Sequence, residues 1–538
     1  MTRVVTYDTT LRDGTQGEGV SLSLLDKLDI ARRLDGLGID YIEAGYPASN
    51  PKDQEVFRAL AEKPLAHARP VAFGMTRRVG TRAEDDAGLA GVLAAGTEAV
   101  ALVGKAWEFH VRNVLRTDPD ENLAMVRDSV RLAKEAGRTV FFDAEHYFDG
   151  YKASADAALA VLAAALEAGA DWLVLCDTNG GCLPEEVHEI VEATAREVGG
   201  ALAVHCHNDT GLAVANSLAA VRAGCTQVQG TINGLGERCG NADLCVLVPD
   251  LELKMGRQCL GPERLARLTE VSRFVYDVAN LLMVPGQPYV GPAAFAHKGG
   301  MHASAVAREE TSYEHVDPAR VGNTRRILVS ELSGRGTILA KVGGTRFETD
   351  EALQKKVLEE VQQRENAGYH YEAAEASFVL LVRRLAGLAE PFFDLDHYTV
   401  AIKKDDDREP VTEATVKLCV DGVWQHTVAE GDGPVNALDA ALRKALNAAY
   451  PNLEAMSLTD YKVRVINTGA GTAASVRVVI ESRDRDEHWG TVGVSENIID
   501  ASWQALVDSF EYKLTKDGEQ ASHKPPATSD KPTTTNDK

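Results

Sequence analysis

The sequence lacks the features that mark secreted, membrane-spanning and nucleic-acid-binding proteins. No apolar run approaches the ~20 residues needed to cross a bilayer. The start, MTRVVTYDTTLRDG, has no basic segment followed by a small-residue cleavage site. Positive charge is scarce, because 57 Lys and Arg stand against 80 Asp and Glu, whereas phosphate neutralisation needs clustered Lys and Arg. We therefore expect a cytoplasmic protein with no membrane segment and no nucleic-acid partner.

Cysteine-pairing motifs are missing as well. The eight cysteines include no CxxC pair, and most of them fall inside expected strands and helices. This usage is typical of reduced core residues rather than of a disulfide framework. The chain has 538 residues, more than one ordinary core accommodates, so we expect two or three structural units.

The first half of the chain has the pattern of a parallel barrel. From residue 4 to about 235, short β-branched or apolar runs alternate with amphipathic stretches, which is typical of βα units around a parallel sheet. Eight such runs predict the α/β fold class and a (β/α)8 TIM barrel in residues 1–260. The expected strands begin at Val4, Tyr41, Pro70, Ala99, Thr139, Trp172, Leu202 and Gln227.

Three further regions follow the barrel. Residues 261–385 are expected to form helical subdomains and contain the stretch HKGGMHASAV. Residues 386–516 contain two successive βββα patterns, which predict an α+β (βββα)2 domain. Residues 517–538 are rich in Ser, Thr, Pro, Lys and Asp and are expected to be disordered.

Polar residues gather at the carboxyl ends of the expected strands, where TIM barrels place their active sites. Each one alone could be a loop residue that faces solvent. Together they predict a site at this end of the barrel. The seven residues are Asp13, Glu43, Glu145, Asp177, His205, His207 and Asn233.

Two histidines on the seventh expected strand predict a metal site. His205 and His207 are two residues apart, so their imidazoles point to the same face of the strand. With Asp13, expected on the first strand, they supply two nitrogens and a carboxylate and leave coordination positions open. This set accepts a divalent ion such as Zn, Mn or Mg, and the residues leave that choice open.

Arg12 precedes Asp13 and indicates an anionic ligand. A guanidinium can form a fork with an oxoacid while a metal polarises its carbonyl, which fits a small 2-keto compound. The alternative is a surface ion pair between Arg12 and Asp13, which would make the carboxylate unavailable to the metal.

Three segments together resemble a known family. DTTLRDGTQ, HCHND and GLGERCGNA are similar to the signatures of the metal-dependent Claisen-condensing barrel enzymes, namely the isopropylmalate, homocitrate and citramalate synthases. The βββα repeat resembles the allosteric dimerisation domain of the isopropylmalate and citramalate synthases. YIEAGYPASNPKD, AFGMTRR and FDAEHYFDGYK are most similar to the citramalate synthase branch.

The resemblance implies an acyltransferase that condenses acetyl-CoA with a small 2-keto acid. In the citramalate branch the keto acid is pyruvate and the product is (R)-citramalate, which leads to isoleucine. Ketoisovalerate and ketoglutarate, which would give 2-isopropylmalate and homocitrate, are the alternatives. A lyase of the hydroxymethylglutaryl-CoA type shares the metal motif but ordinarily lacks the repeat. A sensor with an inactive barrel is opposed by the complete motif set.

The same resemblance assigns the ligand-binding residues. Arg12 would hold the keto acid and Thr178 would hold its carboxylate. Glu43 is a further substrate-binding candidate that could instead orient Arg12. Phe142, Met75 and Val103 are candidates for the wall beside the keto-acid side chain. The metal ligands would be Asp13, which also binds substrate, together with His205, His207 and Asn241.

The catalytic residues are implied in the same way. Arg12 would stabilise the developing alkoxide, and Glu145 would lie near the reacting carbons. His302 matches the family's general base, and Tyr313 matches a tyrosine that assists condensation. Ser304 stands where some relatives carry an acid that polarises this histidine, which leaves the partner of His302 open.

The C-terminal repeat implies regulation. By resemblance we expect a homodimer and a branched-chain amino acid effector, isoleucine first, bound between the two βββα units. Gly469 and Gly471 are candidates for pocket backbone.

Overall fold

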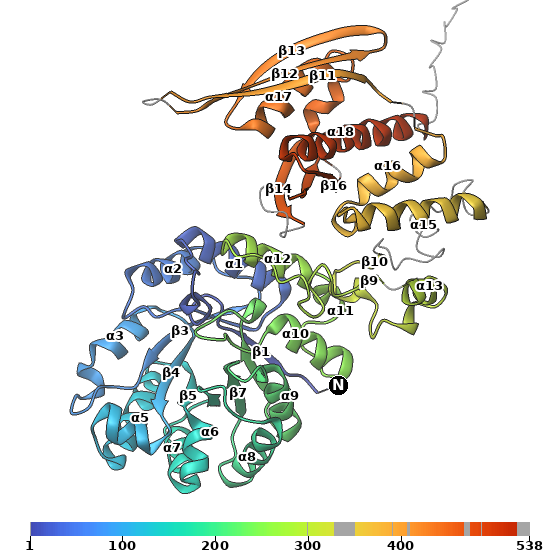
Figure 1. The fold of residues 1–538 in the computed structure, drawn as a ribbon. Coiled ribbons are helices and arrows are strands. Elements are labelled where there is room, and N and C mark those ends of the chain that lie inside the picture. Colours follow the sequence, from blue (N-terminus) through green and yellow to red (C-terminus); the bar gives the residue numbers. More distant parts are fainter. Residues whose placement is uncertain are drawn as a thin grey trace, which may run out of the picture. The chain divides into compact units, whose positions relative to one another are not determined.

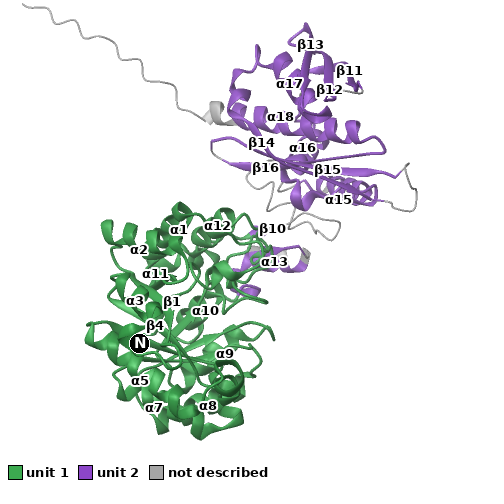
Figure 2. Ribbon diagram, turned by 90° about the vertical axis from the view of Figure 1, so that its left-hand side faces the viewer, with its two compact units in different colours: residues 1–295, 315–325 green, residues 296–314, 326–538 purple. Residues whose placement is uncertain are grey.

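The computed structural model describes residues 2–298, 300–327, 350–389, 391–405, 409–466, 474–485 and 487–523. It divides into two compact units (Figure 2). Unit 1 comprises residues 1–295 and 315–325, and unit 2 comprises residues 296–314 and 326–538. Gly469 and Gly471 lie outside the described residues.

Unit 1 is built on a closed barrel of eight parallel strands in sequence order (Figure 1). The barrel closes because β1 pairs in parallel with both β2 and β8. The predicted TIM barrel and all eight predicted strands are confirmed. The strands are β1 Val5–Asp8, β2 Tyr41–Gly45, β3 Arg69–Met75, β4 Ala99–Lys105, β5 Thr139–Glu145, β6 Trp172–Asp177, β7 Leu202–Cys206 and β8 Gln227–Gly230.

Helices alternate with the strands of unit 1 and surround the barrel (Figure 1). Their ends follow local rules: Ser23 caps the start of α1 in a capping box, and Gly38 ends it in the left-handed conformation. The helices are α1 Leu24–Leu37, α2 Pro51–Glu62, α3 Ala87–Ala94, α4 Glu108–His110, α5 Pro119–Glu135, α6 Tyr147–Ala153, α7 Ala155–Glu167, α8 Pro184–Glu197, α9 Ala213–Ala223, α10 Leu244–Pro249, α11 Pro262–Leu265 and α12 Leu268–Val278.

The barrel interior is a packed core that ends below the carboxyl face of the strands. Alternate residues face inward, so Phe141 and Tyr7 meet there with ring centroids 5.2 Å apart. Phe142, between inward-facing Phe141 and Asp143, packs instead in the core cluster shared by strands and helices. The expectation that Phe142 forms a wall at the barrel mouth is therefore wrong, because it has the opposite strand parity.

Unit 2 contains the predicted repeat. Two three-stranded antiparallel sheets, β11–β12–β13 and β14–β15–β16, are each followed by a helix, so the (βββα)2 prediction is confirmed. The elements are β9 Ala296–His297, α13 Gly300–Arg308, β10 Arg326–Ile327, α15 Glu351–Asn366, α16 Glu375–Leu385, β11 Asp394–Lys403, β12 Val411–Val420, β13 Val423–Gly431, α17 Pro434–Leu446, β14 Ser457–Val465, β15 Val476–Arg483, β16 His488–Ser495 and α18 Ile498–His523.

The units do not follow the expected boundaries at residues 260, 385 and 516. Helices α11 and α12 belong to unit 1, whereas α13, α15 and α16 belong to unit 2 with the sheets. Helix α18 continues to His523, so the start of the expected disordered tail is helical. Its extension is stabilised by Lys513, which pairs with Asp484 at 2.9 Å and with Asp517 at 2.8 Å.

The strands of the repeat bury one face against the helices. In β12, buried Ala414, Val416 and Leu418 alternate with more exposed residues and pack in one cluster with Leu438 and Leu442 of α17.

Among the described helices, none is long and apolar enough to cross a membrane.

Candidate metal centre and active site

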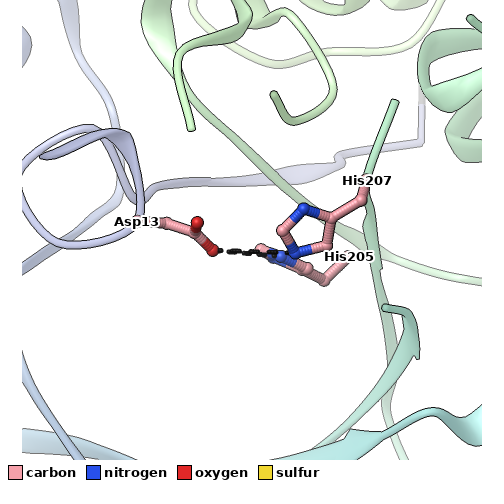
Figure 3. Close-up of side chains that lie close together, drawn as sticks. All are labelled: Asp13, His205 and His207. Atoms are coloured by element: carbon pink, nitrogen blue, oxygen red, sulfur yellow. Dashed lines mark ion pairs between the residues drawn. The ribbon is translucent and has the colours of Figure 1, made fainter. Parts of the chain in front are cut away.

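Asp13, His205 and His207 converge at the carboxyl end of the barrel (Figure 3). The Asp13 Oδ2 atom lies 3.4 Å from His205 Nε2 and 4.0 Å from His207 Nε2. All three residues are buried. His205 is on β7 and His207 follows it directly, whereas β1 ends at Asp8. Asp13 is therefore on the loop after the first strand, not on the strand itself as expected.

Asn241 lies beside this group, because a Cβ atom at Gly236 would be close to both the Asn241 amide and Asp13 Oδ1. The Asn241 backbone pairs with that of His207, and its Nδ2 donates to the Leu235 carbonyl at 3.0 Å. Asn241 Oδ1, Asp13 Oδ1 and His207 Nδ1 are buried and have no hydrogen-bond partner. Buried polar atoms are nearly always paired, so the two unpaired oxygens, Asp13 Oδ1 and Asn241 Oδ1, are consistent with a ligand-binding role. Two imidazoles, a carboxylate and an amide oxygen fit a divalent metal ion.

A glycine in the same loop makes room for Asn241. Gly236 has φ +153°, and a Cβ atom there would lie 2.1 Å from Asn241 Nδ2. Any side chain at position 236 would therefore displace the amide from the cluster.

The protonation states of Asp13 and His207 favour metal binding, whereas at His205 burial lowers the pKa but the hydrogen bond and the charge of Asp13 raise it overall. The pKa of Asp13 is raised by burial, but Arg12 and then His205 hold it well below its usual range. Burial, together with the neighbouring His205, lowers the pKa of His207 to about 4. His205 Nδ1 lies 3.2 Å from Gln229 Oε1, an acceptor that places the proton on Nδ1 and leaves Nε2 toward Asp13. A carboxylate and neutral imidazoles are the forms that ligate metals.

Arg12 is held rigidly beside this group. Its Nε donates to Glu43 Oε1 at 2.5 Å, and the Tyr7 hydroxyl donates to Glu43 Oε2 at 2.6 Å. The guanidinium carbon lies 4.0 Å from the centre of the Phe73 ring. Since both oxygens of fully buried Glu43 are engaged, this residue orients Arg12.

Arg12 and Asp13 do form an ion pair, which was the alternative to a metal site, but the pair is buried. Arg12 Nη1 lies 3.2 Å from Asp13 Oδ2, but the side chains are only 15% and 4% exposed, so the pair is not at the surface. Asp13 Oδ1 keeps no partner. The contact therefore leaves one carboxylate oxygen for a metal.

Thr178 is fixed at both its hydroxyl and its carbonyl. Its Oγ1 accepts a hydrogen bond from the His146 backbone N–H at 2.8 Å, and its carbonyl accepts one from Arg238 at 2.7 Å. Arg238 also forms a fork with Asp209, at 2.8 and 2.9 Å. The HCHND and GERCGNA segments are therefore tied to the loop after β6.

The remaining strand-end residues differ in their roles. Glu145 ends β5 and forms an ion pair with Lys105, which ends β4. The Asp177 carboxylate accepts backbone hydrogen bonds within the next loop, including one from Cys182. Asn233 bonds to α12. Asp177 and Asn233, two of the seven residues expected at the site, therefore have structural partners.

His302 and Tyr313 are brought together in unit 2. His302 lies on α13, and its ring stacks on that of Tyr313 with centroids 4.1 Å apart and planes 23° apart. Both side chains are exposed. The next residue, buried Glu314, lies 3.0 Å from His297 Nε2. The side chain of Ser304 lies outside the described part of the chain.

Sequence reasoning missed several residues of the site. Gln229 had an available signal, because it is an inward-facing polar residue on β8. Lys105 acts through a pairing between two strand ends, and Asp209 and Arg238 act through a pairing between two loops. Sequence spacing does not reveal these pairings.

Comparison with known proteins agrees with this geometry. Residues 3–275 match the HMGL-like family, residues 289–368 the homocitrate synthase post-HMGL domain-like family, and residues 372–514 the LeuA allosteric (dimerisation) domain. The chain is 51% identical over 522 residues to the (R)-citramalate synthase of Aquifex aeolicus (strain VF5), covering 96% of this chain and 99% of that protein. The chain belongs to the citramalate synthase family.

The chain is also similar to another (R)-citramalate synthase and, at lower identity, to a probable 2-isopropylmalate synthase. The (R)-citramalate synthase of Geobacter sulfurreducens is 50% identical over 96% of this chain and 99% of its own length. A probable 2-isopropylmalate synthase of Methanopyrus kandleri is 33% identical over 94% of this chain and 97% of its own length. The resemblance to the citramalate synthase branch and the expected C-terminal dimerisation domain are confirmed.

Two substitutions test the metal centre. Asp13→Asn removes the central charged ligand, so we expect Zn²⁺ and Mn²⁺ binding to be lost. Gln229→Met removes the acceptor that orients His205, and we expect affinity to fall about 10- to 100-fold. Competition with a chromogenic chelator measures both effects.

The matched control is Glu18→Gln, an exposed carboxylate on the same loop as Asp13. It should bind the metals as the wild-type protein does. Unchanged affinity in Asp13→Asn would contradict the assignment of the centre.

Proposed function

We propose that this chain condenses acetyl-CoA with pyruvate and water to give (R)-citramalate and CoA, the first step of a route from pyruvate to isoleucine. The observation that carries the proposal is the buried Asp13–His205–His207 group with the Arg12 guanidinium 3.2 Å from Asp13. The similarity to (R)-citramalate synthases over 96% of the chain supports pyruvate as the keto acid. The lower identity to a probable 2-isopropylmalate synthase, 33%, makes ketoisovalerate the weaker alternative.

The barrel residues would bind and orient the keto acid. Asp13, His205, His207 and Asn241 would hold a divalent ion, which when bound polarises the keto carbonyl. Arg12, aimed by Glu43, would donate hydrogen bonds to the oxygen on which charge develops. Thr178 receives a hydrogen bond at Oγ1 from a backbone N–H, so its own hydroxyl proton is available to the substrate carboxylate.

The residues of α13 and its neighbour would handle the acetyl group. His302 would take a proton from the acetyl methyl, and Tyr313, stacked on it, would stabilise the enolate oxygen. The enolate carbon attacks the keto carbon to give citramalyl-CoA. Glu145, held by Lys105, would lie beside the reacting carbons. Hydrolysis of the thioester then releases citramalate and CoA.

A comparison of keto acids tests the reaction. With acetyl-CoA and a divalent metal, CoA release measured with a thiol reagent should be fastest with pyruvate. Ketoisovalerate, with its larger side chain, should react at least about 10-fold more slowly in kcat/KM, because each methylene is worth ~1–3 kcal/mol. Ketoglutarate should also be slower. A higher rate with either alternative would reassign the substrate, and no release with any keto acid would refute the activity.

The general base is tested by His302→Ala. Loss of a positioned base should lower kcat by about 10²- to 10⁴-fold while leaving metal affinity and pyruvate binding unchanged. His397→Ala, an exposed histidine on β11, is the control and should keep full turnover. Unchanged turnover in His302→Ala would exclude this role.

We further propose that unit 2 forms a homodimer and binds isoleucine as a feedback inhibitor. The match to the LeuA allosteric (dimerisation) domain supports both parts. A cavity of about 600 Å³ between α17 and β14 is lined by the ion pair of Arg443 with Asp439, 2.8 Å apart, which would receive the carboxylate and the ammonium group, and by Met456 and Leu458 for an apolar side chain. Asp439 Oδ1 is buried there without a partner.

Isoleucine should therefore inhibit CoA release by the full-length protein, and Asp439→Asn should weaken inhibition without changing the uninhibited rate. Sedimentation velocity of the same preparation measures the dimer. If isoleucine leaves the rate of a dimeric preparation unchanged, this effector is wrong.

A further inference from the structure

The thioester hydrolysis that ends the proposed reaction needs a base to activate water, and none of the residues discussed so far is assigned to it. We propose that His146 activates this water, with Asp149 as its positioning residue. The inference rests on the proposed function, because it assigns the second half of the same reaction.

The backbone of His146 is in an unusual conformation beside the site. With φ 56° and ψ 35° it is left-handed, a conformation that is strained for a residue other than glycine. Its backbone N–H holds Thr178, and it directly follows Glu145. The imidazole is therefore carried by a residue that directly follows Glu145 and is hydrogen-bonded to Thr178.

The local structure does not itself require histidine here. His146 occupies the N-cap position of α6, but its side chain makes no capping hydrogen bond. Glycine or asparagine would adopt the left-handed conformation at lower cost. Neither the left-handed turn nor the helix cap therefore explains the choice of histidine.

The ring is oriented as a base needs to be. His146 Nδ1 lies 3.2 Å from Asp149 Oδ2, and Asn179 Nδ2 donates to the same oxygen at 2.9 Å. The hydrogen bond from His146 lowers the pKa of Asp149, so the carboxylate is ionised and keeps the imidazole proton on Nδ1. Nε2 is then the basic nitrogen, as in triads in which a carboxylate orients a histidine.

A second imidazole and an indole fix the plane of this ring. The His110 ring lies 4.2 Å from that of His146, and the Trp107 ring lies 5.7 Å from it. His110 Nδ1 is buried without a partner, and burial, followed by His146, lowers the pKa of His110. A neutral His110 adds no positive charge that would oppose protonation of His146 during the reaction.

The proposed step balances with water alone. His146 Nε2 takes a proton from water as the water oxygen bonds to the thioester carbon. The bond from that carbon to sulfur then breaks, and the proton on Nε2 passes to the departing sulfur. The products are a carboxylic acid, which ionises in solution, and the free thiol of CoA.

His146→Gln tests the proposal, because glutamine is polar and of similar length but cannot take up a proton. The variant is assayed with acetyl-CoA and the keto acid that the wild-type protein turns over fastest. We expect CoA release to fall at least about 100-fold. The condensed acyl-CoA should accumulate to roughly one equivalent per active site, as seen by mass spectrometry of acid-quenched reactions. Asp149→Asn should accumulate the same species.

His188→Gln is the matched control, since His188 is a partly buried barrel histidine with one hydrogen bond, to the Ala219 carbonyl. It should release CoA at the wild-type rate without accumulation. Wild-type CoA release from His146→Gln would overturn the proposal. So would loss of condensation and hydrolysis together in a variant with wild-type metal affinity. Failure of the proposed function is distinguishable, because wild-type protein would then release no CoA.

Discussion

The buried ion pair between Arg12 and Glu43 is the interaction on which the site depends. A guanidinium inside a barrel mouth is tolerated only when carboxylates surround it, and here Glu43 and Asp13 supply them from the second strand and the first loop. Tyr7 fixes the far oxygen of Glu43. Arg12 in turn keeps Asp13 ionised, so the same charges that hold the arginine also keep the carboxylate ready for a cation.

Strand alternation explains how much of this could be predicted. Alternation with a period of two residues can be read from the sequence. It predicts the eight strands, the shared face of His205 and His207, and the polar carboxyl face of the barrel. Phe142 lies outside the barrel interior because its strand parity is opposite to that of Phe141. Asp13 was expected on a strand, although β1 ends at Asp8 and a short turn carries the carboxylate inward.

Other features depend on contacts between loops that are distant in sequence. The fork of Arg238 on Asp209 and the hydrogen bond from His146 to Thr178 join segments about 30 residues apart, and no local propensity encodes such pairs. The left-handed backbone conformation of His146 cannot be predicted from the sequence for the same reason, since the packing around the residue stabilises it. The stack of His302 on Tyr313 forms between a helix and the segment after it.

The closure of the barrel between β1 and β8 has a consequence for biosynthesis. The loop that carries Asp13 leaves the ribosome first, whereas Asn241 follows the last strand, so the donor set spans almost the entire barrel sequence. A nascent chain that has not yet reached β8 holds only part of the cluster, and β1 lacks one of its two neighbours. If Asp13, His205, His207 and Asn241 hold a cation as proposed, a chain that stops before β8 would lack one of the four, so complete binding would require that the whole barrel has been made.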